Sequence, residues 1–306
     1  MTVVTVVENI DAGEVRLRCT IAGPQAGAGS SSAATGDGGR APLVVLLHGF
    51  PECASSWEGV QRALAAKGYR VVAPDMRGYG GSDKPRGVKA YAIPRLVADV
   101  AGLVRALGTT RAHVVGHDWG GVVAWWTAML EPDLVDRLAI VNAPHPVGYA
   151  SALRTWAQLR RAWYVFFFQL PWLPERALGW RDFAALRETF RADGISERQI
   201  DDCVEAMRSP GARSAAVGYY RAGMRGTVFG TQPAFRKIER PTLVVWGERD
   251  RFLVPALAEP PREWVSDART VRLPEATHWA PIDSAVRVAE ELDAHFKADP
   301  SNQQGT

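Results

Sequence analysis

The stretch at residues 112–121 constrains the fold more than any other part of this chain, and it reads A-H-V-V-G-H-D-W-G-G. A short apolar run ends at Gly116, Asp118 follows between Gly116 and Gly120, and a helix-like run then covers 122–130. This is the strand–turn–helix pattern G-x-nucleophile-x-G, in which glycines permit unusual backbone angles and close helix–strand packing. It predicts a sharp turn that presents a reactive side chain. Here that side chain is a carboxylate, Asp118, instead of a serine hydroxyl.

Strand-like and helix-like segments alternate along most of the chain. Residues 3–7 and 14–19 are β-rich and flank a D-x-G turn, which is consistent with a hairpin. Further strands are expected at 43–47, 69–73, 137–141, 242–246 and 270–273, and helices at 55–67, 94–107, 122–130 and 284–296. This alternation predicts a parallel, doubly wound sheet.

The alternation stops between residues 146 and 237. This segment is helix-like and rich in aromatic residues, and it has no strand-like run. A helical insertion into such a core is expected to be a cap, or lid, over a site. The predicted domains are a core at 1–145, the cap at 146–237 and the rest of the core at 238–306, with a flexible Gly/Ser-rich loop at about 23–40.

Composition excludes several classes of function. The net charge of +3 comes from scattered arginines with no basic block, which argues against nucleic acid as a partner. No apolar run is long enough to span a membrane. Three unevenly spaced cysteines and an N-terminus without a basic region favour a cytoplasmic protein. The turn at 79–81 lacks the phosphate-loop motifs, so no nucleotide site is expected.

Two residues complete a candidate catalytic triad with Asp118. Asp250 follows the apolar strand at 242–246, and His278 follows the last strand. Taken alone, an Asp or a His at such a place is more often a surface or capping residue. All three lie at strand ends in the chain order nucleophile, acid, histidine, and this order favours the triad.

The sequence H-G-F-P-E after the first buried strand predicts an oxyanion hole. One backbone N–H is expected from Phe50 and the other from Trp119, the residue after the nucleophile. Glu52, His117 and His145 lie near these motifs, and we interpret them as structural residues.

The motifs H-G-F-P-E, D-M-R-G-Y-G-G-S-D-K-P, G-H-D-W-G-G, W-G-E-R-D and T-H-W together resemble the epoxide hydrolases of the α/β-hydrolase superfamily. The resemblance covers nearly the whole chain apart from the Gly/Ser-rich loop. It implies an α/β-hydrolase fold with a mostly parallel, eight-stranded sheet flanked by helices and an inserted helical cap. It also implies conversion of an apolar epoxide to a vicinal diol through an ester on Asp118, hydrolysed by water that His278 and Asp250 activate.

The same resemblance assigns the acids that open the epoxide ring. A segment ending in Phe-Gln resembles the family's first lid-tyrosine segment and implies Tyr164. An aromatic-Tyr-Arg segment resembles the second and implies Tyr220 as partner, not Tyr219. The alternative is that these tyrosines only pack within the cap, as most tyrosines in such helices do.

Two other functions remain open at this point. Haloalkane and haloacetate dehalogenases share the Asp nucleophile and the cap, but a halide leaves unprotonated, whereas an epoxide oxygen needs an acid. Phe50, where the haloalkane enzymes often place an asparagine, also favours an epoxide. The other alternative is a non-catalytic protein that binds a small ligand, which would be expected to have lost a triad residue or a lid tyrosine. A serine esterase is disfavoured by Asp118.

An aromatic-rich pocket predicts a small apolar substrate, with water as the second reactant. The expected lining is Phe50, Pro51, Trp119, Trp163, Phe168 and Trp279. No metal or organic cofactor is expected, and the protein would be a monomer or a homodimer.

Overall fold

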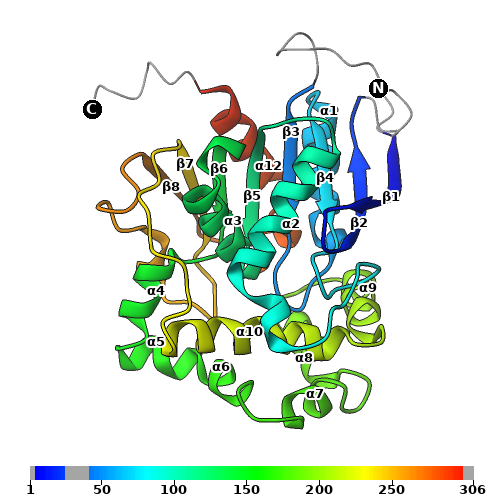
Figure 1. Ribbon diagram of the computed structural model, residues 1–306, viewed down its shortest axis with the longest axis vertical. Coiled ribbons are helices and arrows are strands. Elements are labelled where there is room, and N and C mark those ends of the chain that lie inside the picture. The colour runs from blue at the N-terminus through cyan, green and yellow to red at the C-terminus, as the bar shows by residue number, and fades with distance from the viewer. Residues whose placement is uncertain (1–3, 25–40, 299–306) are drawn as a thin grey trace.

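The computed structural model describes residues 4–24 and 41–298. Most of the predicted Gly/Ser-rich loop, and the first residue of the predicted strand at 3–7, lie outside these described residues. The fold is organised around one sheet, with helices on both of its faces and a helical segment at one end (Figure 1).

The sheet has eight strands in the order β1-β2-β4-β3-β5-β6-β7-β8. β1 pairs antiparallel with β2, β2 pairs antiparallel with β4, and all the remaining pairs are parallel. This confirms the predicted eight-stranded, mostly parallel sheet. The strands are β1 Thr5–Asp11, β2 Arg16–Ala22, β3 Leu43–Leu47, β4 Arg70–Pro74, β5 Ala112–His117, β6 Val135–Val141, β7 Thr242–Gly247 and β8 Ala268–Leu273.

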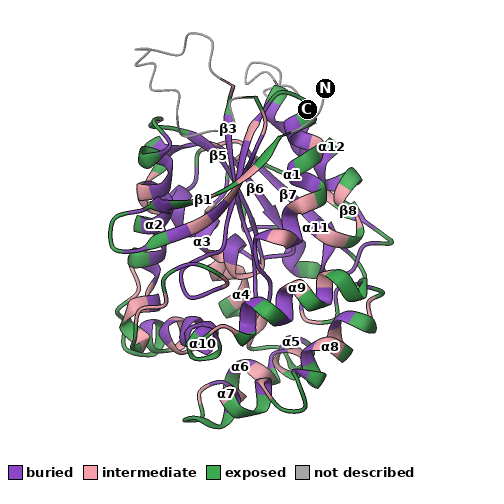
Figure 2. Cartoon of the chain, turned by 90° about the vertical axis from the view of Figure 1, so that its right-hand side faces the viewer, coloured by how far each residue is buried: buried purple, intermediate pink, exposed green. Residues whose placement is uncertain are grey.

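Helices cover both faces of the sheet, so central strands are buried along their whole length. Every residue of β3, β5 and β7 is buried (Figure 2). One face packs against α1 (Glu58–Ala66), α11 (Ala280–Asp283) and α12 (Ala285–Lys297), and the other against α2 (Ile93–Ala106) and α3 (Trp119–Leu130). Short 3-10 turns lie at Ala54–Trp57, Val88–Tyr91, Pro132–Leu134 and Pro255–Ala258.

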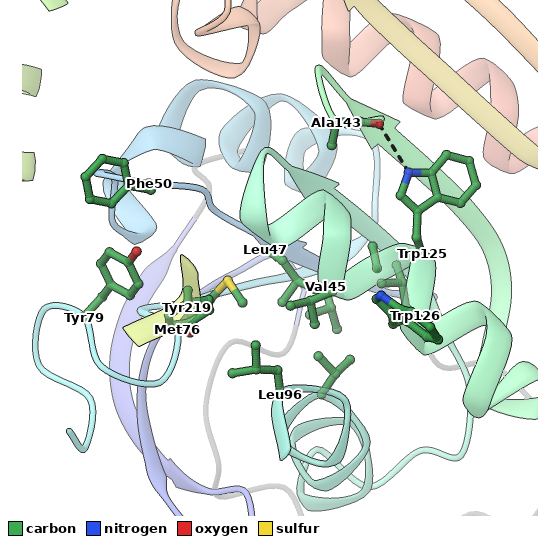
Figure 3. Close-up of a cluster of buried hydrophobic side chains, with 14 of the residues drawn as sticks. Val45, Leu47, Phe50, Met76, Tyr79, Leu96, Trp125, Trp126, Ala143 and Tyr219 are labelled. Carbon is green, nitrogen blue, oxygen red and sulfur yellow. Dashed lines mark hydrogen bonds between the residues drawn. The ribbon is translucent and has the colours of Figure 1, made fainter. Parts of the chain in front are cut away.

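Large apolar side chains join α3 to the sheet beneath it. Trp125 and Trp126 on α3 belong to the same buried cluster as Val45 and Leu47 of β3 (Figure 3). The indole N–H of Trp125 donates to the backbone oxygen of Ala143, 3.2 Å away, so the ring is buried without losing its hydrogen bond. This packing anchors the helix that begins directly after Asp118.

Several predicted boundaries differ from the structure by a few residues. The hairpin strands begin two residues later than expected and extend further, because ladder pairing from Thr5↔Ala22 to Asp11↔Arg16 includes polar residues. The helix expected at 55–67 is divided into a 3-10 turn and α1. The helix expected from residue 122 begins at Trp119.

Seven helices connect β6 to β7. They are α4 Pro146–Ala152, α5 Trp156–Arg161, α6 Trp163–Phe167, α7 Leu173–Leu178, α8 Ala184–Arg191, α9 Glu197–Arg208 and α10 Ala212–Val228. They lie together beyond one end of the sheet (Figure 1). Hydrogen bonds attach them to the core: the Tyr219 hydroxyl donates to the Arg77 oxygen at 2.7 Å, and the buried Gln158 amide bonds Phe252 and Val254 of the core.

No described helix is both long and apolar enough to cross a membrane. Within residues 4–24 and 41–298, no three His, Cys, Asp or Glu side chains are grouped so that they could hold a metal ion.

Candidate active site

The turn between β5 and α3 has the sharp geometry that the G-x-D-x-G pattern predicts. Asp118 has φ 48° and ψ −120°, a conformation that L-residues rarely adopt. A Cβ on Gly116 would lie 2.2 Å from the backbone oxygen of Gly120, and one on Gly120 would lie 2.2 Å from that of Leu47. Only glycine fits at either position, so the sequence pattern follows directly from the close packing of strand and helix.

The Asp118 carboxylate is held between a backbone donor and an imidazole. Its Oδ1 accepts a 2.8 Å hydrogen bond from the backbone N–H of Phe50. Its Oδ2 lies 3.6 Å from Nε2 of His278. Trp119 is the first residue of α3, so its backbone N–H has no acceptor within the helix. Of the two predicted oxyanion-hole donors, the Phe50 N–H bonds this carboxylate and the Trp119 N–H is free of a helical acceptor.

His278 and Asp250 form a buried pair. Nδ1 of His278 lies 2.7 Å from Oδ2 of Asp250. Burial disfavours the charged imidazolium, but the Asp250 carboxylate and then Asp118 outweigh it and raise the pKa of His278 to about 10. Burial likewise opposes ionisation of Asp250, yet His278 and the Asn142 amide hold its pKa below the usual value. Asp250 therefore stays ionised and the imidazole is protonated near neutral pH.

Asn142 is a supporting residue that sequence reasoning missed. It follows β6 with φ 41°, and its amide nitrogen donates to Oδ2 of Asp250 at 2.8 Å. Its amide oxygen accepts from the backbone N–H of Gly247 at 2.9 Å. The N–H groups of Phe252 and Leu253 bond the other Asp250 oxygen at 2.7 and 2.9 Å. Its position at a strand end, as for Asp118 and Asp250, was the signal that could have identified it.

His117 and Glu52 lie behind the triad. His117 Nε2 is 2.8 Å from the backbone oxygen of His278, which can only accept, so Nε2 carries a proton. His117 Nδ1 is 2.7 Å from Oε2 of Glu52, which also accepts from the N–H of Gly49 at 2.8 Å. The pair joins the loop of His278 to the loop of Phe50, which agrees with a structural role. His145 is also buried, and neither ring nitrogen has a hydrogen-bond partner in the described chain.

Tyr164 on α6 and Tyr220 on α10 come together near Asp118. Their ring centroids are 5.9 Å apart. Burial raises the pKa of each phenol well above its ordinary value, and the charge on Asp118 adds to the effect on both. Both phenols therefore remain protonated and are able to donate. Tyr219 differs, because its hydroxyl is already bonded to the backbone oxygen of Arg77.

Two further residues near these groups were not predicted. Tyr149 on α4 has a raised pKa, caused by burial and then by the charge on Asp118, so its phenol lies within range of that charge. The ring of Phe252 lies 5.0 Å from His278 and 6.1 Å from Tyr164, between triad and cap. No motif marks Tyr149, whereas Phe252 lies two residues after Asp250 and could have been suspected from that position.

Aromatic rings surround the two phenols. Phe50 lies 5.5 Å from Phe168 and 5.4 Å from Tyr220, and Trp119 lies 5.1 Å from Tyr220. Pro51 follows Phe50 through a cis peptide bond. These contacts bring four of the six predicted pocket residues to the part of the molecule where Asp118 lies.

The remaining two predicted pocket residues behave differently. Trp279 is buried beside Phe190 at 4.4 Å, and its indole N–H donates to Asp193 at 3.0 Å, so it packs behind the triad. Trp163 is 63% exposed, with its ring against Phe167 at 6.1 Å. The expectation that Trp163 lines the pocket is corrected by this exposure, because the side chain points out of the helical segment.

A cavity of about 620 Å³ lies elsewhere, between the β1–β2 side of the sheet and α9. Its lining includes several charged residues, among them Arg18 and Asp75, which pair at 3.3 Å, and Arg198, which pairs with Glu58. None of the triad residues or lid tyrosines lines it. The convergence of the Asp118 carboxylate, the His278 imidazole and the two phenols, and not cavity size, identifies the candidate active site.

Comparisons with known proteins indicate the family to which this chain belongs. A family profile described as alpha/beta hydrolase fold matches residues 42–191. The AB hydrolase superfamily protein YfhM of Bacillus subtilis is 37% identical over 246 residues, covering 78% of this chain and 84% of that protein. Epoxide hydrolase 3 of Xenopus tropicalis is 37% identical over 272 residues, covering 85% and 72%. Epoxide hydrolase 4 of Homo sapiens is 36% identical over 262 residues, covering 82% and 70%.

Solved structures show the same fold. The Bacillus megaterium epoxide hydrolase in complex with an inhibitor superposes with a TM-score of 0.81 at 24% identity, covering 96% of this chain and 100% of that one. Epoxide Hydrolase A from Mycobacterium thermoresistibile gives 0.76 at 28% identity, covering 97% and 99%. Fold and site together define an α/β-hydrolase with a carboxylate at the nucleophile position. Within that superfamily, the chain belongs to the epoxide hydrolase family.

Proposed function

We propose that the protein hydrolyses an apolar epoxide to a vicinal diol through a covalent ester on Asp118. The observation that carries this proposal is the meeting of two protonated phenols, Tyr164 and Tyr220, with a carboxylate that is paired to a buried imidazole. Relatives named as epoxide hydrolases support the same reaction.

In the first step, a carboxylate oxygen of Asp118 attacks one carbon of the epoxide and the carbon–oxygen bond of the ring breaks. The departing oxygen would be a basic alkoxide in the absence of an acid. Tyr164 and Tyr220 hydrogen-bond this oxygen, and one of them transfers its proton. A halide would need no such acid, so the paired phenols favour an epoxide over a haloalkane.

In the second step, water attacks the carbonyl carbon of the ester. Alkylation removes the negative charge of Asp118, which is one of the groups that raise the pKa of His278. The imidazolium therefore loses its proton more readily once the ester has formed, and this proton restores the phenol that acted as the acid. The neutral imidazole then takes a proton from the attacking water, while Asp250 continues to orient it. The backbone N–H groups of Phe50 and Trp119 stabilise the tetrahedral oxyanion, and each such donor typically contributes about 3 kcal/mol. The diol then leaves.

The helical segment at 146–237 serves as the cap in this scheme. It supplies Tyr164 from α6 and Tyr220 from α10, so the acids reach the substrate from the side opposite the triad. Its aromatic residues exclude bulk water from the reacting atoms, which strengthens the electrostatic interactions between them.

Trapping the ester tests the proposal. His278→Gln should form the ester and fail to hydrolyse it, so intact-mass spectrometry after incubation with styrene oxide should show one added substrate mass, located by peptide mapping at Asp118. Asp118→Ala is the control and should stay unmodified. An unmodified His278→Gln protein that remains folded would contradict the scheme.

A further inference from the structure

Between residues 156 and 180 the helical segment exposes large apolar side chains, here called the aromatic patch. Trp156 is 73% exposed and Trp180 is 68% exposed, and within the described chain every tryptophan classed as exposed belongs to this group. The members are Trp156, Trp163, Phe166, Leu170, Trp172, Leu173 and Trp180. α6 and α7, which carry part of the patch, lie on the side of α10 that faces away from the sheet (Figures 1 and 2).

The exposed side chains of this segment lie next in sequence to side chains that are buried. α6 and its C-cap direct Val165 and Phe168 inward, where both are buried, while Trp163 and Phe166 face solvent. Trp172 has φ 51°, a left-handed conformation that costs a bulky residue roughly 1–3 kcal/mol. Its ring nevertheless remains 63% exposed, so burial of the ring does not offset the cost of this backbone conformation. Such a surface fits a partner outside the chain.

Arginines without an ion-pair partner lie in the same stretch of the chain as the patch. The exposed arginines Arg154, Arg160, Arg176 and Arg181 have no carboxylate within ion-pair distance among the described residues. The nearby carboxylates are already paired, Glu175 with Arg221 at 2.5 Å and Asp182 with Arg187 at 3.3 Å. The patch therefore combines tryptophans with unneutralised guanidinium groups.

We propose that the aromatic patch binds the surface of an anionic lipid bilayer. Tryptophan rings favour the headgroup level of a bilayer, and arginines there can bond lipid phosphates while their stems lie along apolar surface. A second copy of this chain fits less well, since a two-fold contact would place two sets of unpaired arginines against each other. The binding is interfacial and requires no spanning helix.

Vesicle flotation tests this surface in the full-length protein. The protein is mixed with vesicles of phosphatidylcholine alone, or with about one third phosphatidylglycerol, at low and high salt. We expect flotation with the anionic vesicles, weakened by salt. The double variant Trp156→Ser/Trp180→Ser should reduce the partition roughly tenfold or more, because two large apolar side chains no longer enter the interface. Val286→Ser, at an equally exposed apolar position on α12, should leave it unchanged.

Arginine variants test the charge separately. Arg160→Gln and Arg181→Gln should each lower the partition roughly fivefold, whereas Arg105→Gln on α2 should not. Should the tryptophan double variant fail to fold, Trp172→Asn replaces it, since asparagine tolerates the left-handed conformation. Absence of flotation, equal flotation with both vesicles, or a dimer in light scattering that the tryptophan variants dissociate without vesicle binding would each overturn the proposal.

Discussion

Removing the charge of Asp118 should lower the pKa of His278. The two groups face each other, with Oδ2 of Asp118 3.6 Å from Nε2 of His278, and Asp118 is one of the groups that raise this pKa to about 10. Asp118→Asn keeps the shape of the side chain and removes its negative charge. It therefore reproduces the electrostatic change that ester formation is proposed to cause.

The magnitude follows from the distance. Two unit charges 3.6 Å apart interact by roughly 4–5 kcal/mol at an effective dielectric constant of about 20, or about three pKa units. The carboxylate charge is shared by two oxygens, and Oδ1 is turned toward the N–H of Phe50. A decrease of about one to two units is therefore expected. Asp250 remains in place, so the pKa of His278 stays above that of a free histidine.

Imidazole NMR titration measures this change, with the His278 signals assigned by their loss in His278→Gln. A decrease of less than about half a pKa unit in Asp118→Asn would refute the electrostatic coupling between Asp118 and His278.

The pH dependence of protein stability provides a second measurement. Because folding raises the pKa of His278, its stabilisation is complete below about pH 6.5 and is lost as the pH rises toward about 10. Denaturant unfolding should show a smaller loss over this range in Asp118→Asn.

Three further predictions concern single side chains. Asn142→Ala removes the amide bonded to Asp250. It should lower the free energy of unfolding, measured by urea titration, by about 2–3 kcal/mol, and it should also lower the turnover rate. Unchanged stability and activity would exclude the supporting role. Tyr220→Phe should slow alkylation in single-turnover experiments by roughly 10²-fold or more, whereas Tyr219→Phe should cost about 1 kcal/mol of stability and leave alkylation intact. Equal rates for these two variants would contradict the assignment of the acid. Gly116→Ala should prevent folding to the native elbow, because its Cβ would lie 2.2 Å from a backbone oxygen, and native thermal stability in this variant would contradict the packing argument.

Much of the core was predictable because its signals are local. The glycines beside Asp118 follow from contacts within one turn, and β3 and β7 are short apolar runs buried on both faces. The hairpin boundaries were less clear, since pairing between β1 and β2 continues through polar residues that carry no apolar signal.

The helical segment was predictable only in outline. α6 has five residues, too few for helical periodicity to show that Tyr164 faces inward while Trp163 faces solvent. Asn142 and Tyr149 acquire their contacts from segments distant in the chain: Asn142 meets Asp250 across 108 positions. Such contacts depend on how strands and helices are assembled. The position of Asn142 at a strand end marks it as a candidate, but the sequence does not show which residue it contacts.

The origin of the oxygen in the product tests the central claim most directly. The protein, in excess over an epoxide, would turn it over once in water enriched in ¹⁸O, and the diol would be analysed by mass spectrometry. If Asp118 is the nucleophile, the first-turnover diol carries no ¹⁸O, because its new oxygen comes from the carboxylate, and the label appears in Asp118 on peptide mapping. A diol labelled in that first turnover, with Asp118 unlabelled, would contradict the covalent mechanism.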